Sequence, residues 1–314
     1  MSQSQTRFDT PLAGTWGLWP EPRSYWSYSS LNDIETCPLR WMLSRADYPD
    51  LWSGRGYPPS PAVAALFGDI VHTALETIVV SLQAAGCTSP QSADAAEVLR
   101  TLGGLTHVID QVVTDHMTRL AVNPRLSSDR TAAVRRALAE RVPEARTRVQ
   151  SILSRTNLPA RRSAGSASTP DAPSISGDHP ATLDRGAFPE VALTASDLRL
   201  AGRIDLITVG EDHVRITDYK TGNEDPAHLD QLRTYALLWA RDSTANPARR
   251  LATELLVEYP THNIRVSGPD ADELRALETK IAERIVIADD LVGHPPPPAK
   301  PDPEVCRFCA VRQM

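Results

Sequence analysis

The chain reads Gly-Arg-Ile-Asp at residues 202–205 and Asp-Tyr-Lys-Thr-Gly at residues 218–222. Apolar and polar residues alternate over 198–208, which predicts a half-buried strand around the first stretch. A turn at 210–213 leads into a second strand-like run over 214–220. We therefore expect the two stretches to lie on neighbouring antiparallel strands.

Two carboxylates and a lysine converge on this predicted hairpin. Side chains two residues apart on a strand share a face, so Asp218 and Lys220 point the same way. Antiparallel pairing brings Asp205 beside them. Crowded carboxylates raise each other's pKa unless a cation lies between them, and Mg²⁺ is commonly held by one or two carboxylates. The hairpin thus predicts a metal site that polarises a phosphodiester and activates water, with Lys220 supporting the nucleophile or the developing charge. The plainer alternative for Asp218 and Lys220 is an ion pair on an edge strand.

Helical patterns surround the hairpin. A helix that begins at Pro61 and runs to about residue 85 is apolar nearly all round, which predicts a buried helix. Residues 93–156 predict two or three further helices, and 226–241 and 270–291 predict one each. The remaining short strand candidates are 190–194, 255–259 and 264–267.

The order of these motifs resembles the PD-(D/E)-x-K nuclease superfamily, specifically its RecB-like branch, which includes the AddB nuclease domain and the CRISPR-associated adaptation exonuclease. Besides the hairpin stretches, the chain matches a G-x-x-x-H helix motif at Gly68 and His72, and a Q-x-x-x-Y helix motif at Gln231 and Tyr235. The resemblance implies an α/β fold with a restriction-endonuclease-like core, in which helices flank a central mixed sheet and a helical insertion is added.

The resemblance also implies roles for individual residues. The implied ligands for Mg²⁺ or Mn²⁺ are His72, Asp205, Asp218 and the main-chain carbonyl of Tyr219. The implied catalytic set is Lys220, Asp205, Asp218, Glu190, Gln231 and Tyr235. Taken singly, His72 also fits a core histidine, Glu190 a surface residue, and Gln231 with Tyr235 a packed polar pair.

The four cysteines are unevenly placed. In the iron–sulfur subset of the resembled branch, one cysteine precedes the histidine helix and three lie at the C-terminal end, and Cys37, Cys306 and Cys309 match three of these positions. The fourth position falls just beyond Met314, so three of the four thiolates of a [4Fe–4S] cluster are present. Such a cluster would join the two chain ends. Cys87 is an alternative fourth ligand, although it lies outside the motif. Zinc binding is a further alternative, as are unligated thiols.

Charge is distributed asymmetrically along the chain. Of its 314 residues, 33 are basic and 39 acidic, and a net charge of -6 argues against a general nucleic-acid coat. Residues 119–162 nevertheless hold 11 arginines against three acidic residues, a local charge of 11 - 3 = +8. We expect this segment to contact the DNA backbone, the alternative being a solvated helix face. The arginines predicted as contacts are Arg135, Arg136, Arg141 and Arg148.

Five segments are predicted along the chain. They are an N-terminal segment with the first cysteine (1–60), the histidine helix with a basic helical insertion (61–159), a flexible linker (160–185), the nuclease core (186–292) and a proline-rich tail with the C-x-x-C (293–314). No apolar run long enough for a membrane span is evident, and the polar N-terminus lacks a signal-peptide layout. We therefore expect a soluble cytoplasmic protein without a membrane partner.

The resemblance implies a metal-dependent deoxyribonuclease, an exonuclease acting in DNA processing, repair or anti-phage defence. The sequence has no G-x-x-x-x-G-K-[ST] loop, so strand separation would fall to a helicase or a defence-complex subunit. The alternative is a catalytically silent nucleic-acid-binding or assembly subunit with the same fold. Retention of Lys220 with both aspartates favours the enzyme. A small-molecule enzyme lacks support, because the sequence has neither a phosphate-binding glycine loop nor a G-x-S-x-G motif.

Overall fold

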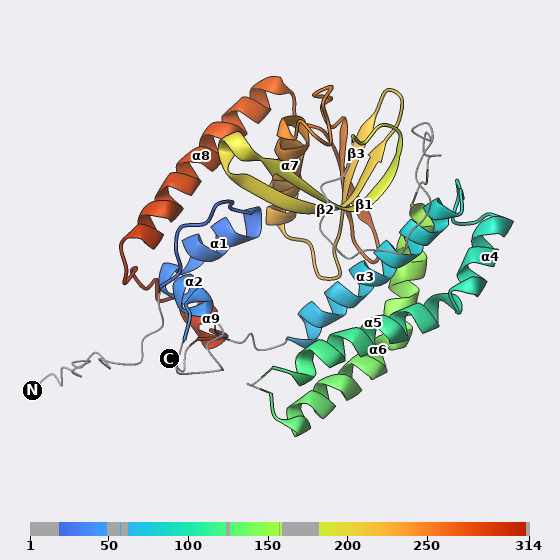
Figure 1. The fold of residues 1–314 in the computed structure, drawn as a ribbon, viewed down its shortest axis with the longest axis horizontal. Coiled ribbons are helices and arrows are strands. Elements are labelled where there is room, and N and C mark those ends of the chain that lie inside the picture. The colour runs from blue at the N-terminus through green and yellow to red at the C-terminus, as the bar shows by residue number, and fades with distance from the viewer. Residues whose placement is uncertain are drawn as a thin grey trace, which may run out of the picture.

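The computed structural model describes residues 19–48, 57, 62–123, 126–156, 158 and 182–311. Its helices are α1 (Tyr28–Thr36), α2 (Pro38–Arg45), α3 (Val63–Ala84), α4 (Ala93–Thr101), α5 (Gly104–Ala121), α6 (Ser128–Arg155), α7 (Pro226–Arg241), α8 (Ala271–Gly293) and α9 (Pro303–Arg307), with a short 3₁₀ helix, η2 (Ser196–Leu198). Its strands are β1 (Gly186–Ala195), β2 (Leu200–Val209), β3 (Val214–Tyr219), β4 (Glu254–Glu258) and β5 (Asn263–Ser267). Figure 1 shows the sheet between two groups of helices.

The strands form one five-stranded sheet in sequence order. Neighbouring strands are antiparallel except β3 and β4, which are parallel and are joined through α7. A parallel pair needs such a crossover, whereas the antiparallel pairs are joined by short turns. This mixed sheet flanked by helices confirms the predicted α/β fold class. β1 begins at Gly186 rather than near residue 190, because its first half pairs with the end of β2.

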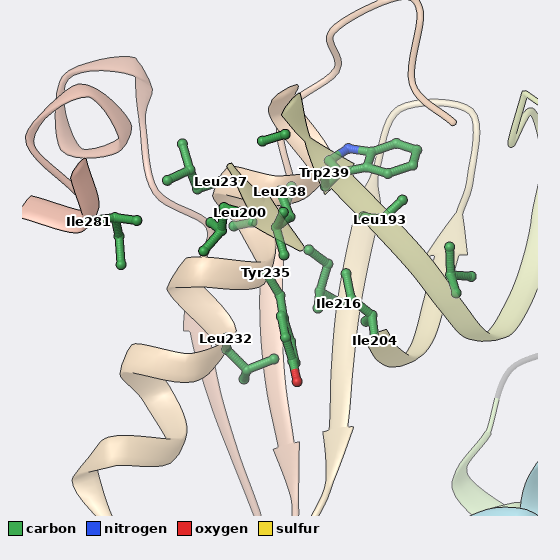
Figure 2. Packing of buried hydrophobic residues seen from close by; sticks show 14 of the residues in the cluster. Leu193, Leu200, Ile204, Ile216, Leu232, Tyr235, Leu237, Leu238, Trp239 and Ile281 are labelled. Carbon is green, nitrogen blue, oxygen red and sulfur yellow. The ribbon is translucent and has the colours of Figure 1, made fainter. Parts of the chain in front are cut away.

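One face of the sheet is covered by α7, with α8 and α1 packed alongside. Leu232, Leu238 and Trp239 of α7 are buried in the same cluster as Ile204 of β2 (Figure 2). Close approach of helix and strand depends on Gly202, because a Cβ at that position would lie 2.8 Å from Cδ1 of Leu238. Asp225 caps the N-terminus of α7 by accepting a hydrogen bond from the main chain, and a proline in the first turn leaves no amide donor unpaired there. The start of α7 is therefore fixed beside the sheet.

The other face carries α3, α5 and α6, which pack against one another and bury Leu206 and Tyr219 from the sheet. α3 is long and apolar enough to cross a membrane by length and composition, with a mean hydropathy of 1.6 over an 18-residue window, contrary to the expectation from sequence. The core helix of a folded domain passes the same test, and 44% of that window is buried inside the structure. Packing against α5, α6 and β1 accounts for these apolar residues.

The two ends of the described chain lie together, with α9 beside α2 (Figure 1). The Lys300 ammonium donates a hydrogen bond to the main-chain oxygen of Glu35 at 2.7 Å, and the Tyr57 hydroxyl donates to that of Ala310 at 2.6 Å. The Arg284 guanidinium of α8 pairs with the Glu35 carboxylate at 2.6 Å. The C-terminal part of the chain is thus fastened to α1 and to Tyr57.

Some predicted boundaries lie outside the described residues. The helix start predicted at Pro61 is one of these, and the described helix begins at Val63 with Ala62 at its N-cap. Of the predicted linker, 160–185, only residues 182–185 are described. The division of the chain into five segments stays a prediction, although α4 to α6 do lie between the histidine helix and the sheet in sequence.

Candidate active site

Asp218 and Lys220 lie at the end of β3 and point to the same side, as the strand period predicted. Their ion pair joins Nζ of Lys220 to Oδ2 of Asp218 at 2.8 Å, and the Asp218 side chain is only 2% exposed. The same ammonium donates to Oε1 of Gln231 at 2.8 Å, and Nε2 of Gln231 donates to the Tyr235 hydroxyl at 2.7 Å. Helical spacing places Gln231 and Tyr235 one turn apart on α7. Four of the predicted catalytic residues therefore form one continuous chain of contacts.

A second group lies next to the first and involves α3, β1 and β2. His72, Glu190 and Asp205 each offer a ligand atom, and these three atoms lie within 4.8 Å of one another. Nδ1 of His72 lies 3.4 Å from Oδ2 of Asp205, and that oxygen also accepts the main-chain N–H of Tyr219 at 2.7 Å. The amide bond ties the β2 carboxylate to the end of β3.

Glu190 reaches this group through an unusual backbone conformation. The pairing of Pro189 with Leu206 and of Val191 with Ile204 places Glu190 opposite Asp205 in the β1–β2 register. Its φ is 50°, in the left-handed region that a non-glycine residue seldom adopts within a strand. Such strain persists only where surrounding structure maintains it, and it concentrates at functional sites.

Electrostatics in this group oppose full ionisation without a cation. Burial raises the pKa of Glu190 to about 7, with the Asp205 and Glu76 charges adding to the effect. Burial, followed by the Asp205 charge, likewise raises the pKa of Asp218 to about 7 against the opposing effect of Lys220. Burial lowers the pKa of His72, but the Asp205 charge and hydrogen bond outweigh it, and the result is about 9. These side chains therefore hold protons that a bound metal cation would displace.

These residues fit a divalent metal ion. Two carboxylates supply the oxygen ligands that Mg²⁺ and Mn²⁺ prefer, and His72 adds one imidazole nitrogen. The observed group differs from the implied ligand set in one respect: Glu190 belongs to it, whereas Oδ2 of Asp218 faces Lys220. The roles of Asp218 and of the Tyr219 carbonyl as ligands stay predictions.

The first group, together with His72 and Asp205 of the second, lines one surface cavity of about 480 Å³. Its lining residues are His72, Asp205, Asp218, Tyr219, Lys220, Thr221, Gly222, Asn223, Glu224, Asp225, His228, Gln231 and Tyr235. Sequence reasoning missed the loop 223–225 and His228. The available signal for His228 was its position three residues before Gln231, which places the two on one helical face.

The four arginines predicted to contact DNA occupy two different environments. Arg135 and Arg136 are exposed on α6. Arg141 and Arg148 instead stack on the Phe67 ring, with guanidinium carbons 3.6 and 5.0 Å from its centroid. Both also pair with the Glu144 carboxylate, at 2.9 and 2.6 Å. One carboxylate thus offsets one of their two positive charges, and the contact of these arginines with DNA stays a prediction.

Arg148 has a further contact that the sequence did not indicate. Its guanidinium donates a hydrogen bond to the main-chain oxygen of Thr221, directly after Lys220. Gly68 of α3 lies against the same loop, since a Cβ there would be 3.2 Å from Oγ1 of Thr221. The loop that follows β3 is thus held by α3 and α6 together.

The cysteines lie in two separate regions. Cys87 is buried among α3, α5 and α6, and so does not join the other three. Cys37 lies between α1 and α2, and Cys309 packs on the cluster formed by α2 and the C-terminal segment. Zinc thiolates would lie ~3.8 Å apart. Among the described residues, no group of three ligands within 4.8 Å includes a cysteine. Zinc binding and the iron–sulfur cluster both stay predictions.

A family model for the PD-(D/E)XK nuclease superfamily matches residues 25–314, a range that includes every site residue described above. A search of curated proteins found no match.

Proposed function

We propose that this chain, which belongs to the PD-(D/E)XK nuclease superfamily, is a Mg²⁺- or Mn²⁺-dependent deoxyribonuclease of the RecB-like branch that degrades DNA from an end. Membership of the superfamily indicates metal-dependent nuclease activity. The choice of DNA, of end-directed cleavage and of the branch rests on the motif order described from the sequence. A role in DNA repair or anti-phage defence, with a helicase or another subunit separating the strands, belongs to the same proposal.

The observation that carries the proposal is the position of Lys220. Its ammonium is held at 2.8 Å from both Asp218 and Gln231, in the cavity that His72 and Asp205 also line. Because two partners already hold the ammonium in place, it needs little reorganisation to stabilise negative charge that develops beside it. A silent subunit has no need of such an arrangement.

Each residue of the site has a separate role in hydrolysis. A divalent ion bound by His72, Glu190 and Asp205 would polarise the phosphodiester and lower the pKa of water. Water adds to phosphorus, the bond to the leaving sugar oxygen breaks, that oxygen gains a proton and the attacking water loses one. Lys220 stabilises the negative charge that develops on the phosphoryl oxygens. Gln231 holds the ammonium in place, and Tyr235 in turn holds Gln231.

The proposal is tested with purified protein and four labelled substrates: linear single-stranded DNA, linear duplex, closed circular single-stranded DNA and RNA of the same sequence. Each is incubated with Mg²⁺, Mn²⁺ or EDTA. The expected result is loss of label from linear DNA with either metal, and no cleavage in EDTA. Cleavage of the circle at the same rate would contradict end-directed action, and preferential cleavage of RNA would contradict the DNA assignment. Binding without cleavage under every condition would favour the silent subunit.

A further inference from the structure

One residue that lines the cavity on the α7 side has no role in the mechanism proposed above. His228 lies in the first turn of α7 and lines the cavity together with Lys220 and Gln231. His228 and Gln231 are three residues apart, so both project from one face of the helix. The His228 side chain is half-buried rather than enclosed in the core. Its ring is therefore placed where a substrate in the cavity would lie.

The hydrogen bonds around this ring determine which nitrogen carries the proton. Nδ1 of His228 lies 2.8 Å from the Tyr259 hydroxyl. Burial raises the pKa of Tyr259, and a backbone hydrogen bond from Asp225 to the hydroxyl acts against that rise. Among the described residues, the only acceptor within hydrogen-bond distance of this hydroxyl is Nδ1 of His228, so we assign the hydroxyl as the donor and Nδ1 as the acceptor. The neutral imidazole then carries its own proton on Nε2, for which the described residues offer no hydrogen-bond partner.

Tyr259 is itself held firmly. It directly follows β4, is 2% exposed, and stacks on the His262 ring with 4.8 Å between centroids. Nε2 of His262 in turn lies 2.6 Å from the Glu224 carboxylate. The imidazole of His228 is therefore oriented before any ligand arrives, which reduces the ordering cost of binding.

The charges nearby favour an anion at Nε2. Burial and then the Lys220 charge lower the pKa of His228, which keeps the ring neutral and its Nε2 a donor, with Asp225 opposing. The N-terminus of α7 adds a partial positive charge. The two carboxylates of the preceding loop are both engaged: that of Asp225 accepts the Ala227 N–H, and that of Glu224 faces His262.

We propose that Nε2–H of His228 donates a hydrogen bond to a non-bridging phosphate oxygen of the nucleic-acid strand, in a subsite next to Lys220. This inference rests on the proposed nuclease function. It makes His228 a substrate-binding residue and gives Tyr259 the task of fixing its tautomer.

Two amide substitutions separate this role from a purely structural one. Asparagine places its amide near the Nδ1 position of the imidazole, so His228→Asn keeps an acceptor for the Tyr259 hydroxyl and loses the donor to the cavity. Glutamine places its amide near the Nε2 position, so His228→Gln keeps the donor and loses the Tyr259 hydrogen bond. His294→Gln, at an exposed position after α8, serves as the matched control.

The variants are compared by kcat/KM on linear DNA with Mn²⁺ and by fluorescence-anisotropy Kd for the same strand in EDTA. For His228→Asn, the expected result is an about threefold to tenfold loss in kcat/KM and in DNA affinity, which is the effect of one hydrogen bond. His228→Gln and the control should both stay close to the unsubstituted protein. The salt dependence of Kd should not change, since a neutral donor displaces no counterion.

The reverse order, with His228→Gln impaired and His228→Asn normal, would overturn the proposal, because it would mean that the ring serves only Tyr259. Equal loss in both variants or in neither would overturn it as well. If the unsubstituted protein binds DNA and cleaves none, the nuclease function fails, and the order of the Kd values still decides the role of His228.

Discussion

Arg148 donates a hydrogen bond from its guanidinium to the main-chain oxygen of Thr221, and so joins the basic helix α6 to the loop that carries the active-site lysine. The guanidinium is also stacked on Phe67 and paired with Glu144, and its side chain is 18% exposed. The sequence predicts that Arg148 contacts DNA, whereas in the structure its guanidinium holds the loop that follows Lys220.

Replacing Arg148 should therefore affect turnover more than binding. We expect Arg148→Gln to lower kcat about tenfold with KM nearly unchanged, because a freed Thr221 carbonyl lets Lys220 move from its place beside Asp218. Arg146→Gln, on an exposed face of the same helix, should behave like the unsubstituted protein. Steady-state kinetics on linear DNA checks this. Normal kcat with weakened binding and a flatter salt dependence would identify Arg148 as a phosphate-binding residue instead.

Arg135 and Arg136 are exposed and should show the opposite pattern. The double substitution to glutamine is expected to weaken DNA binding and to reduce the slope of log Kd against log salt by roughly 0.9 for each phosphate that the protein no longer neutralises. kcat at saturating DNA should stay unchanged, since neither residue lines the cavity. Anisotropy titrations between roughly 50 and 200 mM salt, where such ionic interactions are most visible, measure the slope. An unchanged slope would leave these arginines as a solvated face.

Metal binding can be measured without turnover. Mn²⁺ should raise the thermal midpoint of the protein, by an amount corresponding to about 2.7 kcal/mol when its concentration is about 100 times Kd. Asp205→Asn and Glu190→Gln should each reduce this shift, because each removes a ligand charge from the group. Lys220→Met should retain it. A full shift in Glu190→Gln would remove Glu190 from the ligand set.

Close packing of α7 on β2 gives a stability prediction. Gly202→Ala should destabilise the protein by about 1–3 kcal/mol, because the new Cβ would meet Leu238 at 2.8 Å and Tyr235 at 3.2 Å. Gly293→Ala, where a Cβ meets nothing within 4 Å, is the control. Denaturant unfolding compares the two. Equal free energies of unfolding for the two variants would show that α7 can shift with no loss of stability.

Sequence was sufficient for features that depend on local periodicity. The alternation over β2 and β3 predicted the hairpin and the shared face of Asp218 and Lys220, and helical spacing predicted that Gln231 and Tyr235 lie together. The mixed sheet and its flanking helices were implied by the family resemblance.

Features that depend on long-range packing were beyond the sequence. Glu190 is left-handed within β1, a conformation that propensity argues against for a glutamate, so the sequence did not predict how this residue joins the metal-competent group. The environment of Arg148 depends on Phe67 of α3 and on Thr221, which lie far from it in sequence. His228 becomes a candidate only once β4 brings Tyr259 to its ring.

The rate of DNA cleavage by Lys220→Ala tests the central claim most directly. Single-turnover cleavage of end-labelled linear DNA with saturating Mn²⁺ would be compared with that of the unsubstituted protein, and equal Mn²⁺-induced thermal shifts would show that the metal site is intact. Removing a preorganised charge from the reacting phosphate predicts a fall of ~10²–10³ in rate. Cleavage by Lys220→Ala at the rate of the unsubstituted protein would contradict the account.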